Sequence, residues 1–280
     1  MPELPEVQTI VDDLSTAGIV NAPIQQVEVR WPKSIAGVSP DVFCERLTDI
    51  HIRGVSRRGK YILFFLSSGD TLLIHLRMSG RLCLSTVDAP CSKHEHVILT
   101  LDHGRQLRFH DTRKFGRWLL TDTPGKVLSR LGPEPLAPDF DVAVLMNALG
   151  GRRRILKPLL LDQTVIAGLG NIYTDEALWE AGLHPCRPAS TLTRKEIRHL
   201  HRGIIKVLAQ GLQNRGTTLG EGKANFESVC RSRGRNQNAL KVFGRQGLPC
   251  PRCRTIIQRL LVCQRGTHVC RKCQPLPTEG

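Results

Sequence analysis

Four cysteines near the C-terminus have the spacing of a metal site. Cys250 and Cys253 form one C-x₂-C pair, and Cys270 and Cys273 form a second pair after sixteen intervening residues. This spacing is typical of zinc sites, in which two thiolates from each pair surround the ion. Because four protein ligands leave no open coordination position, we expect one structural Zn²⁺ ion and no small-molecule cofactor.

The alternative interpretation of these cysteines is two disulfides or four ordinary thiols. The N-terminal sequence MPELPEV carries two acids and no apolar stretch, so it is unlike a secretory signal. The longest apolar runs have the length of a strand, and no membrane partner is expected. Disulfides are rare in a reducing interior. We therefore favour the zinc site and a cytoplasmic, nucleoid-associated protein.

Pro2 and Glu3 could perform covalent chemistry at the N-terminus. If Met1 is removed, as the small second residue permits, Pro2 presents a secondary amine. Such an amine can attack a sugar C1′ and form an iminium, as a Schiff-base nucleophile does. Glu3 beside it could transfer protons. A proline in the first turn of a helix is the plainer alternative.

The charge of the chain indicates a polyanionic partner. Forty Lys and Arg against 25 Asp and Glu give a net charge of +15. Residues 211–280 hold thirteen of these cations and only three acids, so +10 of the excess lies there. A nucleic acid is the leading candidate. An anionic membrane surface is the weaker one, since no basic amphipathic helix stands out in the sequence.

Apolar periodicity predicts a β-rich part followed by a helical part. A first helix is expected from Pro5 to Gly18, and the short apolar runs between Ile24 and Asp122 are typical of a sandwich or barrel. The predicted strands are Val27–Val29, Ile50–Ile52, Lys60–Leu66, Thr71–Leu76, His96–Asp102, Gln106–His110 and Trp118–Thr121. The predicted helices are Val142–Leu149, Ile155–Leu161, Ile172–Ala181 and Thr193–Gln213.

Three further segments connect or follow these elements. Residues 131–140 are rich in proline and are predicted to be a linker. Residues 217–240 are polar and basic and are expected to form a mobile loop. Within the cysteine module, Thr255–Val262 and Gly266–Val269 are expected to pair as a hairpin.

Several motifs together resemble one family, the formamidopyrimidine-DNA glycosylases, base-excision enzymes that remove oxidised purines. The resemblance runs from Pro2 to Gln274, and the motifs occur in the family's order. Besides MPELPEV and the cysteine module, the motifs are Arg58–Tyr61, His75–Gly80, Asp111–Gly116, Leu131–Leu136, Leu161–Gln163 and Gly168–Tyr173.

The resemblance implies an α+β fold in four parts. These are an N-terminal β-sandwich with its helix at 1–130, the linker at 131–140, a helical domain at 141–240 and a zinc ribbon at 241–280. The helical domain is implied to contain a helix–two-turn–helix motif and the loop that caps the lesion. A monomer is expected.

The resemblance also implies a bifunctional DNA glycosylase and abasic-site lyase. Its substrates would be 8-oxoguanine and formamidopyrimidines in damaged double-stranded DNA. Pro2 matches the nucleophile that forms the Schiff base, and Glu3 matches the general acid. Lys60 matches the lysine of β-elimination, and Arg265 matches the hairpin arginine assigned to δ-elimination. These four residues must converge in space to act together.

Base excision within a duplex explains further residues. The enzyme must extrude the damaged nucleotide and fill the gap it leaves. Met78, Arg113 and Phe115 suit this task as an apolar wedge, a cation for the widowed base and a stacking plate. The resemblance implies contacts to the DNA backbone, which set register and affinity. The residues at those positions are His94, Arg152, Lys157 and Asn171.

One segment departs from the family. Bacterial relatives usually carry Gly-Tyr-Phe in the loop over the flipped base, whereas Gly220–Asn238 contains only Phe226 as an aromatic residue. An endonuclease VIII-like enzyme for oxidised pyrimidines is therefore an alternative, although that group typically has Gly in place of Leu4. The other alternative is a zinc-ribbon DNA-binding protein without catalysis, which retention of Met1 would favour.

Overall fold

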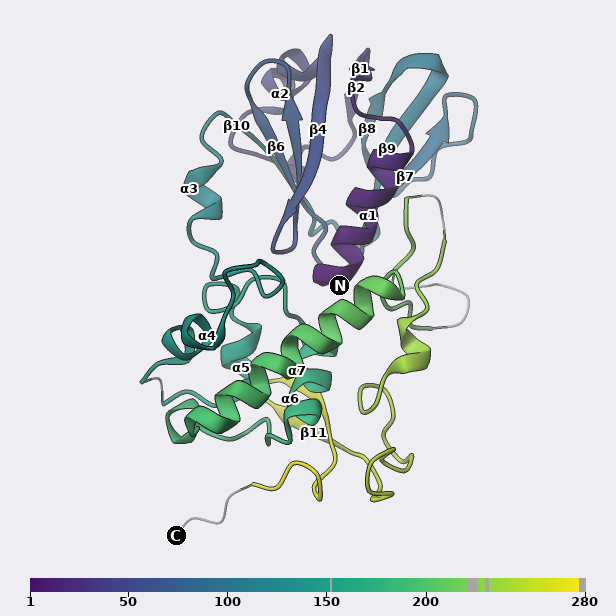
Figure 1. Cartoon of the computed structure of the whole chain (residues 1–280). Coiled ribbons are helices and arrows are strands. Elements are labelled where there is room, and N and C mark those ends of the chain that lie inside the picture. The colour runs from purple at the N-terminus through teal and green to yellow at the C-terminus, as the bar shows by residue number, and fades with distance from the viewer. Residues whose placement is uncertain (152, 221–225, 230–231, 277–280) are drawn as a thin grey trace. The chain divides into compact units, whose positions relative to one another are not determined.

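The computed structural model describes residues 1–151, 153–220, 226–229 and 232–276 (Figure 1). The chain forms two compact units. Unit 1 comprises Met1–Leu128 and Asn214–Arg235, and unit 2 comprises Ser129–Gln213 and Asn236–Gly280. Across the described part of the chain, no helix combines the length and the apolar character needed to cross a membrane.

Unit 1 contains two sheets that enclose one core (Figure 1). The larger sheet has the order β1-β4-β5-β6-β10-β3, and the smaller has the order β2-β8-β9-β7. The strands of the larger sheet are β1 (Pro23–Ile24), β3 (Ile35–Ala36), β4 (Ile50–Arg58), β5 (Tyr61–Leu66), β6 (Thr71–His75) and β10 (Arg117–Thr121). Those of the smaller sheet are β2 (Gln26–Val29), β7 (Gly80–Thr86), β8 (Glu95–Thr100) and β9 (Arg105–Asp111).

The core of unit 1 follows from the alternation of these strands. Phe64 of β5, Phe109 of β9 and Trp118 of β10 are buried in one cluster. Helix α1 (Leu4–Thr16) adds one apolar stripe to this cluster through Val7, Ile10, Leu14 and their neighbours. The predicted sandwich and its N-terminal helix are therefore confirmed.

The N-terminal helix anchors a segment more than 200 residues away in sequence. The Glu6 carboxylate accepts a hydrogen bond from the Glu3 backbone at 2.9 Å and one from the Thr217 backbone at 2.6 Å. Asp13 of the same helix forms an ion pair with Arg215. A buried carboxylate needs such donors, so α1 fixes the start of the segment Asn214–Arg235.

The far part of that segment also packs on the sandwich. Phe226 and Val229 are buried in the core of unit 1, and Arg81 of β7 pairs with Glu227 at 3.2 Å. The expectation of a mobile loop over 217–240 is thus wrong for these residues, because apolar side chains anchor them. Residues 221–225 and 230–231 lie outside the described part of the chain.

Unit 2 is built from helices and one hairpin. Helix α6 lies between α7 on one side and the hairpin β11–β12 on the other. Gly203 of α7 permits a close approach, because a Cβ there would lie 3.0 Å from the Ala177 carbonyl oxygen. The elements are α4 (Val142–Leu149), α5 (Leu156–Leu161), α6 (Asn171–Ala181), α7 (Arg194–Gln213), β11 (Gln258–Val262) and β12 (Arg265–Val269).

Most predicted elements agree with the structure to within a few residues. At the start of α7 a capping box is present, in which the Glu196 carboxylate accepts a hydrogen bond from the Thr193 backbone at 2.8 Å. The strand β7 and the helix α2 (Pro40–Leu47) were missed, as were the two-residue strands β1 and β3. In α2 only Phe43 and Leu47 are buried, which is too weak a periodic signal for recognition. A short helix α3 (Gly125–Leu128) follows the sandwich.

Candidate functional site

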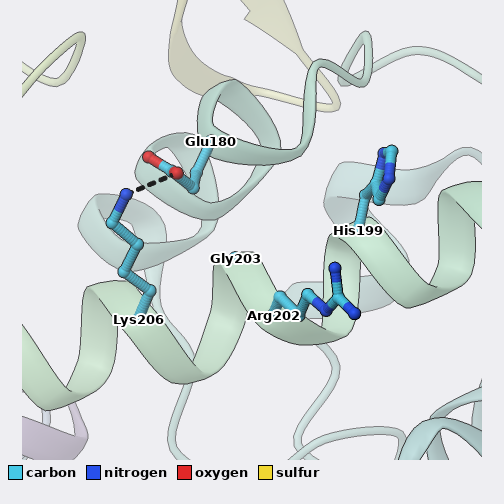
Figure 2. A pocket seen from close by; sticks show the side chains of 5 residues that line it. All are labelled: Glu180, His199, Arg202, Gly203 and Lys206. Carbon is cyan, nitrogen blue, oxygen red and sulfur yellow. Dashed lines mark hydrogen bonds and ion pairs between the residues drawn. The ribbon is translucent and has the colours of Figure 1, made fainter.

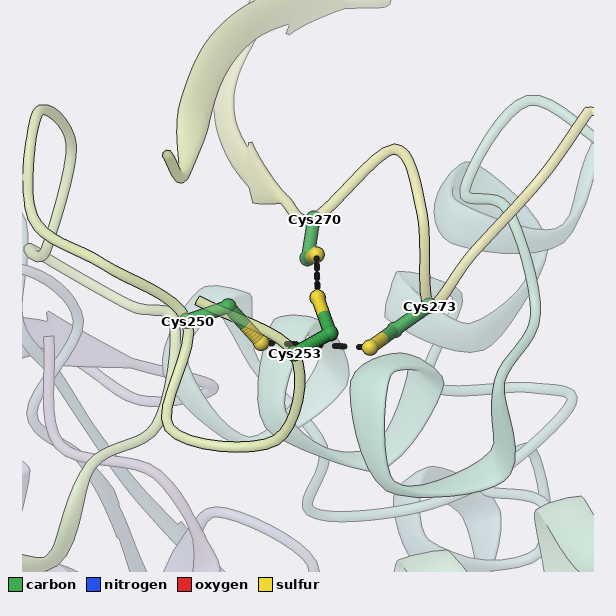
Figure 3. Close-up of side chains that lie close together, drawn as sticks. All are labelled: Cys250, Cys253, Cys270 and Cys273. Carbon is green, nitrogen blue, oxygen red and sulfur yellow. Dashed lines mark hydrogen bonds between the residues drawn. The ribbon is translucent and has the colours of Figure 1, made fainter. Parts of the chain in front are cut away.

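The four predicted metal ligands meet at one point (Figure 3). Their sulfur atoms all lie within 4.8 Å of one another. The Cys253 and Cys270 sulfurs are 3.3 Å apart, and those of Cys250 and Cys273 are 3.9 Å apart. Thiolates bound tetrahedrally to Zn²⁺ lie about 3.8 Å from one another, so the cluster has the dimensions of a closed zinc site.

The chemistry of the cluster also suits zinc. Hydrogen bonds from Thr255 lower the pKa of Cys253 to about 6, which favours the thiolate that binds the metal. The Trp179 indole nitrogen donates to the Cys250 sulfur at 3.4 Å. Such a donor outside the ligand shell orients the sulfur and stabilises its charge.

Helix α6 holds the zinc ribbon through buried acids. The Glu176 carboxylate accepts hydrogen bonds from the backbone of Lys241, Val242 and Phe243 at 2.8, 2.9 and 2.8 Å. Burial raises the pKa of Glu176, and these three donors oppose that rise. The chain entering the ribbon is therefore fixed to α6 before the first cysteine.

Two predicted DNA-binding positions and the predicted catalytic residue Arg265 lie near the N-terminus of α6. The Gly266 carbonyl oxygen accepts from Lys157 Nζ at 3.1 Å and from Asn171 Nδ2 at 3.0 Å. Arg265, the preceding residue in the hairpin, is exposed. Asn171 and Arg265 therefore lie on neighbouring segments, and both belong to unit 2.

Lys157 does not have the surroundings of a residue that contacts DNA. Its side chain and that of Asp175 are both fully buried, and its Nζ lies 2.6 Å from Asp175 Oδ1. The other Asp175 oxygen accepts from the His268 backbone at 2.8 Å. The predicted phosphate contact needs an accessible ammonium group, so the geometry instead assigns Lys157 to positioning the hairpin.

In unit 1, the predicted catalytic side chains surround the chain's N-terminus. Pro2, Glu3 and Lys60 are all buried. Burial lowers the pKa of the Met1 α-amine, the Glu3 and Glu6 carboxylates raise it, and the Lys60 and Arg113 cations lower it further. The charges of Glu3, Lys60 and Arg113 therefore act on the amine that begins the chain.

His75 adds an uncharged wall beside Lys60. Its ring packs edge-on against Tyr61, with 4.8 Å between the ring centroids, and its Nδ1 accepts from the Arg77 backbone at 3.0 Å. Burial, followed by the charges of Arg77 and Lys60, lowers the pKa of His75 to about 3. His75 is consequently neutral at physiological pH and adds no positive charge to the site.

A single buried acid organises the three residues proposed to fill the DNA gap. Asp111 Oδ1 accepts from Ser79 at 2.5 Å and from the Arg113 backbone at 3.1 Å, while Oδ2 accepts from the Gly116 backbone at 2.8 Å. The two loops joined in this way carry Met78, which is 43% exposed, and Phe115, which is 47% exposed. Apolar side chains so exposed are available to a partner.

Arg113 and His94 belong to the same neighbourhood. The Arg113 guanidinium lies 4.8 Å from the centroid of the Phe115 ring, and the His94 carbonyl accepts from the Asp111 backbone at 2.9 Å. His94 is half-buried. Arg152, the remaining predicted DNA contact, lies outside the described residues.

Asp111 and Asp175 act as positioning residues that were not recognised in the sequence. Asp111 begins the motif Asp111–Gly116, but an acid in a basic motif gives no indication of the segment it binds. Asp175 lies on α6, where the eight residues from Ile172 to Trp179 are all buried. An acid inside such a helix needs a partner, but the sequence does not show which residue supplies it.

The fold and these sites define a class of protein: a β-sandwich with an N-terminal helix, and helices that carry a four-cysteine zinc ribbon. Residues 1–118 match the N-terminal domain of formamidopyrimidine-DNA glycosylase, and residues 131–221 match its H2TH domain. Residues 247–276 match the zinc finger found in this enzyme and in isoleucyl-tRNA synthetase. The chain belongs to the formamidopyrimidine-DNA glycosylase family and holds one structural zinc ion.

Individual relatives are similar over nearly their whole length. The chain is 46% identical to the formamidopyrimidine-DNA glycosylase of Protochlamydia amoebophila, covering 98% of this chain and 99% of the relative. It is 48% identical to that of Roseiflexus sp., covering 98% and 100%. A Lactococcus lactis variant solved with DNA containing Fapy-dG has a TM-score of 0.91 and 39% identity, covering 98% of this chain and 100% of that one. The Lactococcus lactis protein with DNA containing an abasic site gives 0.90 and 38% over the same shares.

Replacement of Asp111 tests its role in positioning the gap-filling loops. Asp111→Ala removes the acceptor of the Ser79 hydroxyl and leaves the buried Gly116 backbone donor unsatisfied, so we expect a loss of about 1–3 kcal/mol in the free energy of unfolding. Urea unfolding measures this loss. Asp88→Ala, which removes an exposed acid, is the control and should unfold like the wild type. Equal stability of the two variants would contradict the role.

Loss of one zinc ligand tests the ribbon. Cys253→Ser should bind no zinc and should lose amide-exchange protection between residues 245 and 274, because the metal stabilises so small a module. Metal analysis and hydrogen exchange measure the two effects. The control Cys91→Ser removes an exposed thiol outside the cluster and should retain one zinc ion per chain. Protection that survives without metal would show that the hairpin folds independently.

Proposed function

We propose that this protein excises oxidised purines from DNA and then cleaves the resulting abasic site. As a member of its family it is a DNA glycosylase of base-excision repair with abasic-site lyase activity, and its partner is damaged DNA. The observation that carries the proposal is that Pro2, Glu3 and Lys60 are all buried at the start of the chain, where the charges of Glu3 and Lys60 both act on the N-terminal amine.

Pro2, freed by removal of Met1, attacks C1′ of the damaged nucleotide. The bond from C1′ to the base breaks as the new C–N bond forms, and the proton lost by the amine goes to the departing base. The C1′–O4′ bond then breaks, and Glu3 supplies a proton to O4′ of the opened sugar. The nitrogen of Pro2 and C1′ are then joined as an iminium. The burial of Pro2 beside the buried Glu3 and Lys60 supports this step, because it removes the nucleophile from water and places the proton donor next to it.

The iminium acidifies the C2′ proton, and the strand is then cut in two eliminations. Removal of that proton expels the 3′ phosphate, and we assign Lys60 to this β-elimination. The second elimination expels the 5′ phosphate, and we assign Arg265 to binding that phosphate group. The product is a gap flanked by phosphates.

Met78, Arg113 and Phe115 fill the space that the extruded nucleotide leaves. The exposure of Met78 and Phe115 and the fixing of both loops by Asp111 support this assignment. Asn171, Arg265 and His94 bind the DNA backbone, with Arg152 assigned to the same task by resemblance alone. Lys157 acts as a positioning residue for the hairpin.

We also propose four functional parts: a catalytic sandwich at residues 1–130, a linker at 131–140, a DNA-binding helical domain at 141–240 and a zinc ribbon at 241–280. We further propose that the enzyme works on the bacterial nucleoid, where its substrate lies. The family relatives do not favour the endonuclease VIII-like alternative. Because Phe226 is buried in the core of unit 1, it is not assigned to stacking on the flipped base.

Trapping of the iminium tests the proposed chemistry. We expect borohydride to join Met1-free protein, verified by intact mass, to a duplex containing 8-oxoguanine opposite cytosine. Pro2→Thr should give no adduct, because a primary amine on Thr does not reproduce the geometry of the proline nitrogen. The control Lys126→Gln, an exposed site, should trap like the wild type. Absence of an adduct from the wild type on this duplex and on an oxidised-pyrimidine duplex would leave a DNA-binding protein without chemistry.

The pH dependence of trapping tests the surroundings of the amine. Trapping should fall as the pH drops through the pKa of the amine, because only the neutral amine attacks. Lys60→Met removes a cation from the start of the chain, and a nearby cation disfavours a charged amine, so the acid limb should move to higher pH. Glu3→Gln removes an anion that favours a charged amine, so the limb should move to lower pH. Measured on an abasic-site duplex, shifts of the same sign in both variants would contradict the arrangement.

A further inference from the structure

The exposed face of α7 carries a row of cations. Arg194, Arg198, Arg202 and Lys206 recur at intervals of four residues, and all four are exposed. Residues four apart share a helix face, so the row, here called the cationic ridge, spans about 18 Å along α7. This basic amphipathic helix was not recognised in the sequence.

The ridge is largely without neutralising acids. Among the residues that the structure describes, none of the three arginines pairs with a carboxylate. Lys206 alone pairs with an acid, Glu180 of α6, at 2.6 Å (Figure 2). The acid within α7, Glu196, pairs with Arg187 outside the ridge. Like charges four residues apart destabilise a helix, so the ridge has a cost that folding does not explain.

A hollow lies beside the ridge between α6 and α7 (Figure 2). It is lined by Glu180, His199, Arg202, Gly203 and Lys206. Three of the five lining residues carry basic side chains. Because Glu180 neutralises Lys206, the cation that the hollow offers to a group with negative charge is Arg202 of the ridge.

The ridge lies on the opposite side of α6 from the zinc hairpin. Tyr173 and Ala177 of α6 face α7, where they lie close to Gly211 and Gly203. Asp175 and Trp179 of α6 face the ribbon, where they bind His268 and Cys250. A duplex bound along the hairpin side is therefore on the other face of this unit from the ridge.

The apolar side of α7 distinguishes DNA from a lipid surface. Ile197, Leu200, Ile204 and Leu208 are buried against the rest of unit 2. A helix that binds a membrane inserts its apolar face, and this face is already occupied. Only the charges are presented to a partner, which is the pattern of sequence-independent backbone binding.

We propose that the cationic ridge binds the phosphate backbone of a second duplex while the hairpin side holds the first. Over about 18 Å, one strand of B-DNA presents about five phosphates, which matches the four cations and the hollow. The proposal rests on the proposed function for the hairpin side. Its consequence is direct transfer of the enzyme between DNA segments during the search for lesions.

The test uses enzyme that borohydride has joined to a lesion duplex, so that the first site is filled. A fluorescent lesion-free duplex is then added, and its binding is followed by anisotropy over a range of salt concentrations. We expect the wild type to bind this second duplex. The variant R194Q/R198Q/R202Q should bind it at least about tenfold more weakly, with the salt slope lowered by about 2.7.

A matched variant, K33Q/K126Q/R130Q, loses the same charge from exposed positions elsewhere and should bind the second duplex like the wild type. Both variants should excise the lesion at the wild-type rate in a single turnover. Equal affinity of both variants for the second duplex would overturn the proposal. So would a wild type that does not bind the second duplex.

If no adduct forms, the proposed function fails and the ridge is tested separately. The same variants are then titrated with lesion-free DNA, and the stoichiometry of duplex per protein is measured at low salt. The wild type and the matched control should bind two duplexes, whereas R194Q/R198Q/R202Q should bind one. A stoichiometry of one for the wild type would overturn the proposal.

Discussion

Buried carboxylates, each shared by donors from distant segments, fix the functional side chains of this protein. Asp111 joins the two loops that carry Met78 and Phe115, and Asp175 joins Lys157 to the hairpin next to Arg265. A carboxylate removed from water is costly unless its oxygens are satisfied. The same requirement makes the geometry specific, because the donors must come to the acid from particular directions.

The same principle couples the N-terminal helix to the segment after α7. Glu6 accepts from the Thr217 backbone as well as from the Glu3 backbone, so one residue fixes both the start of the chain and the start of the segment Asn214–Arg235. Its charge also acts on the N-terminal amine.

Elements with a strong periodic pattern were predictable, and elements set by packing were not. Helix α4 and the capped helix α7 agree with their predictions because their apolar spacing and end signals are local. The burial of Phe226 was unforeseen, since a lone aromatic residue in a polar loop gives no indication of the core that receives it. The resemblance assigned Lys157 to the DNA backbone, and its burial against Asp175 is visible only in the structure.

The sequence by itself determined the zinc ligands, the order of sandwich, helices and ribbon, and the family, because spacing and motif order are properties of the chain. Only the tertiary structure decided which charges act on the N-terminal amine and which acid organises each loop. It also decided that the cations of α7 face outward on the side away from the hairpin. The reason is physical: desolvation and partner geometry depend on atoms brought together from distant positions, and these are fixed only when the core has formed.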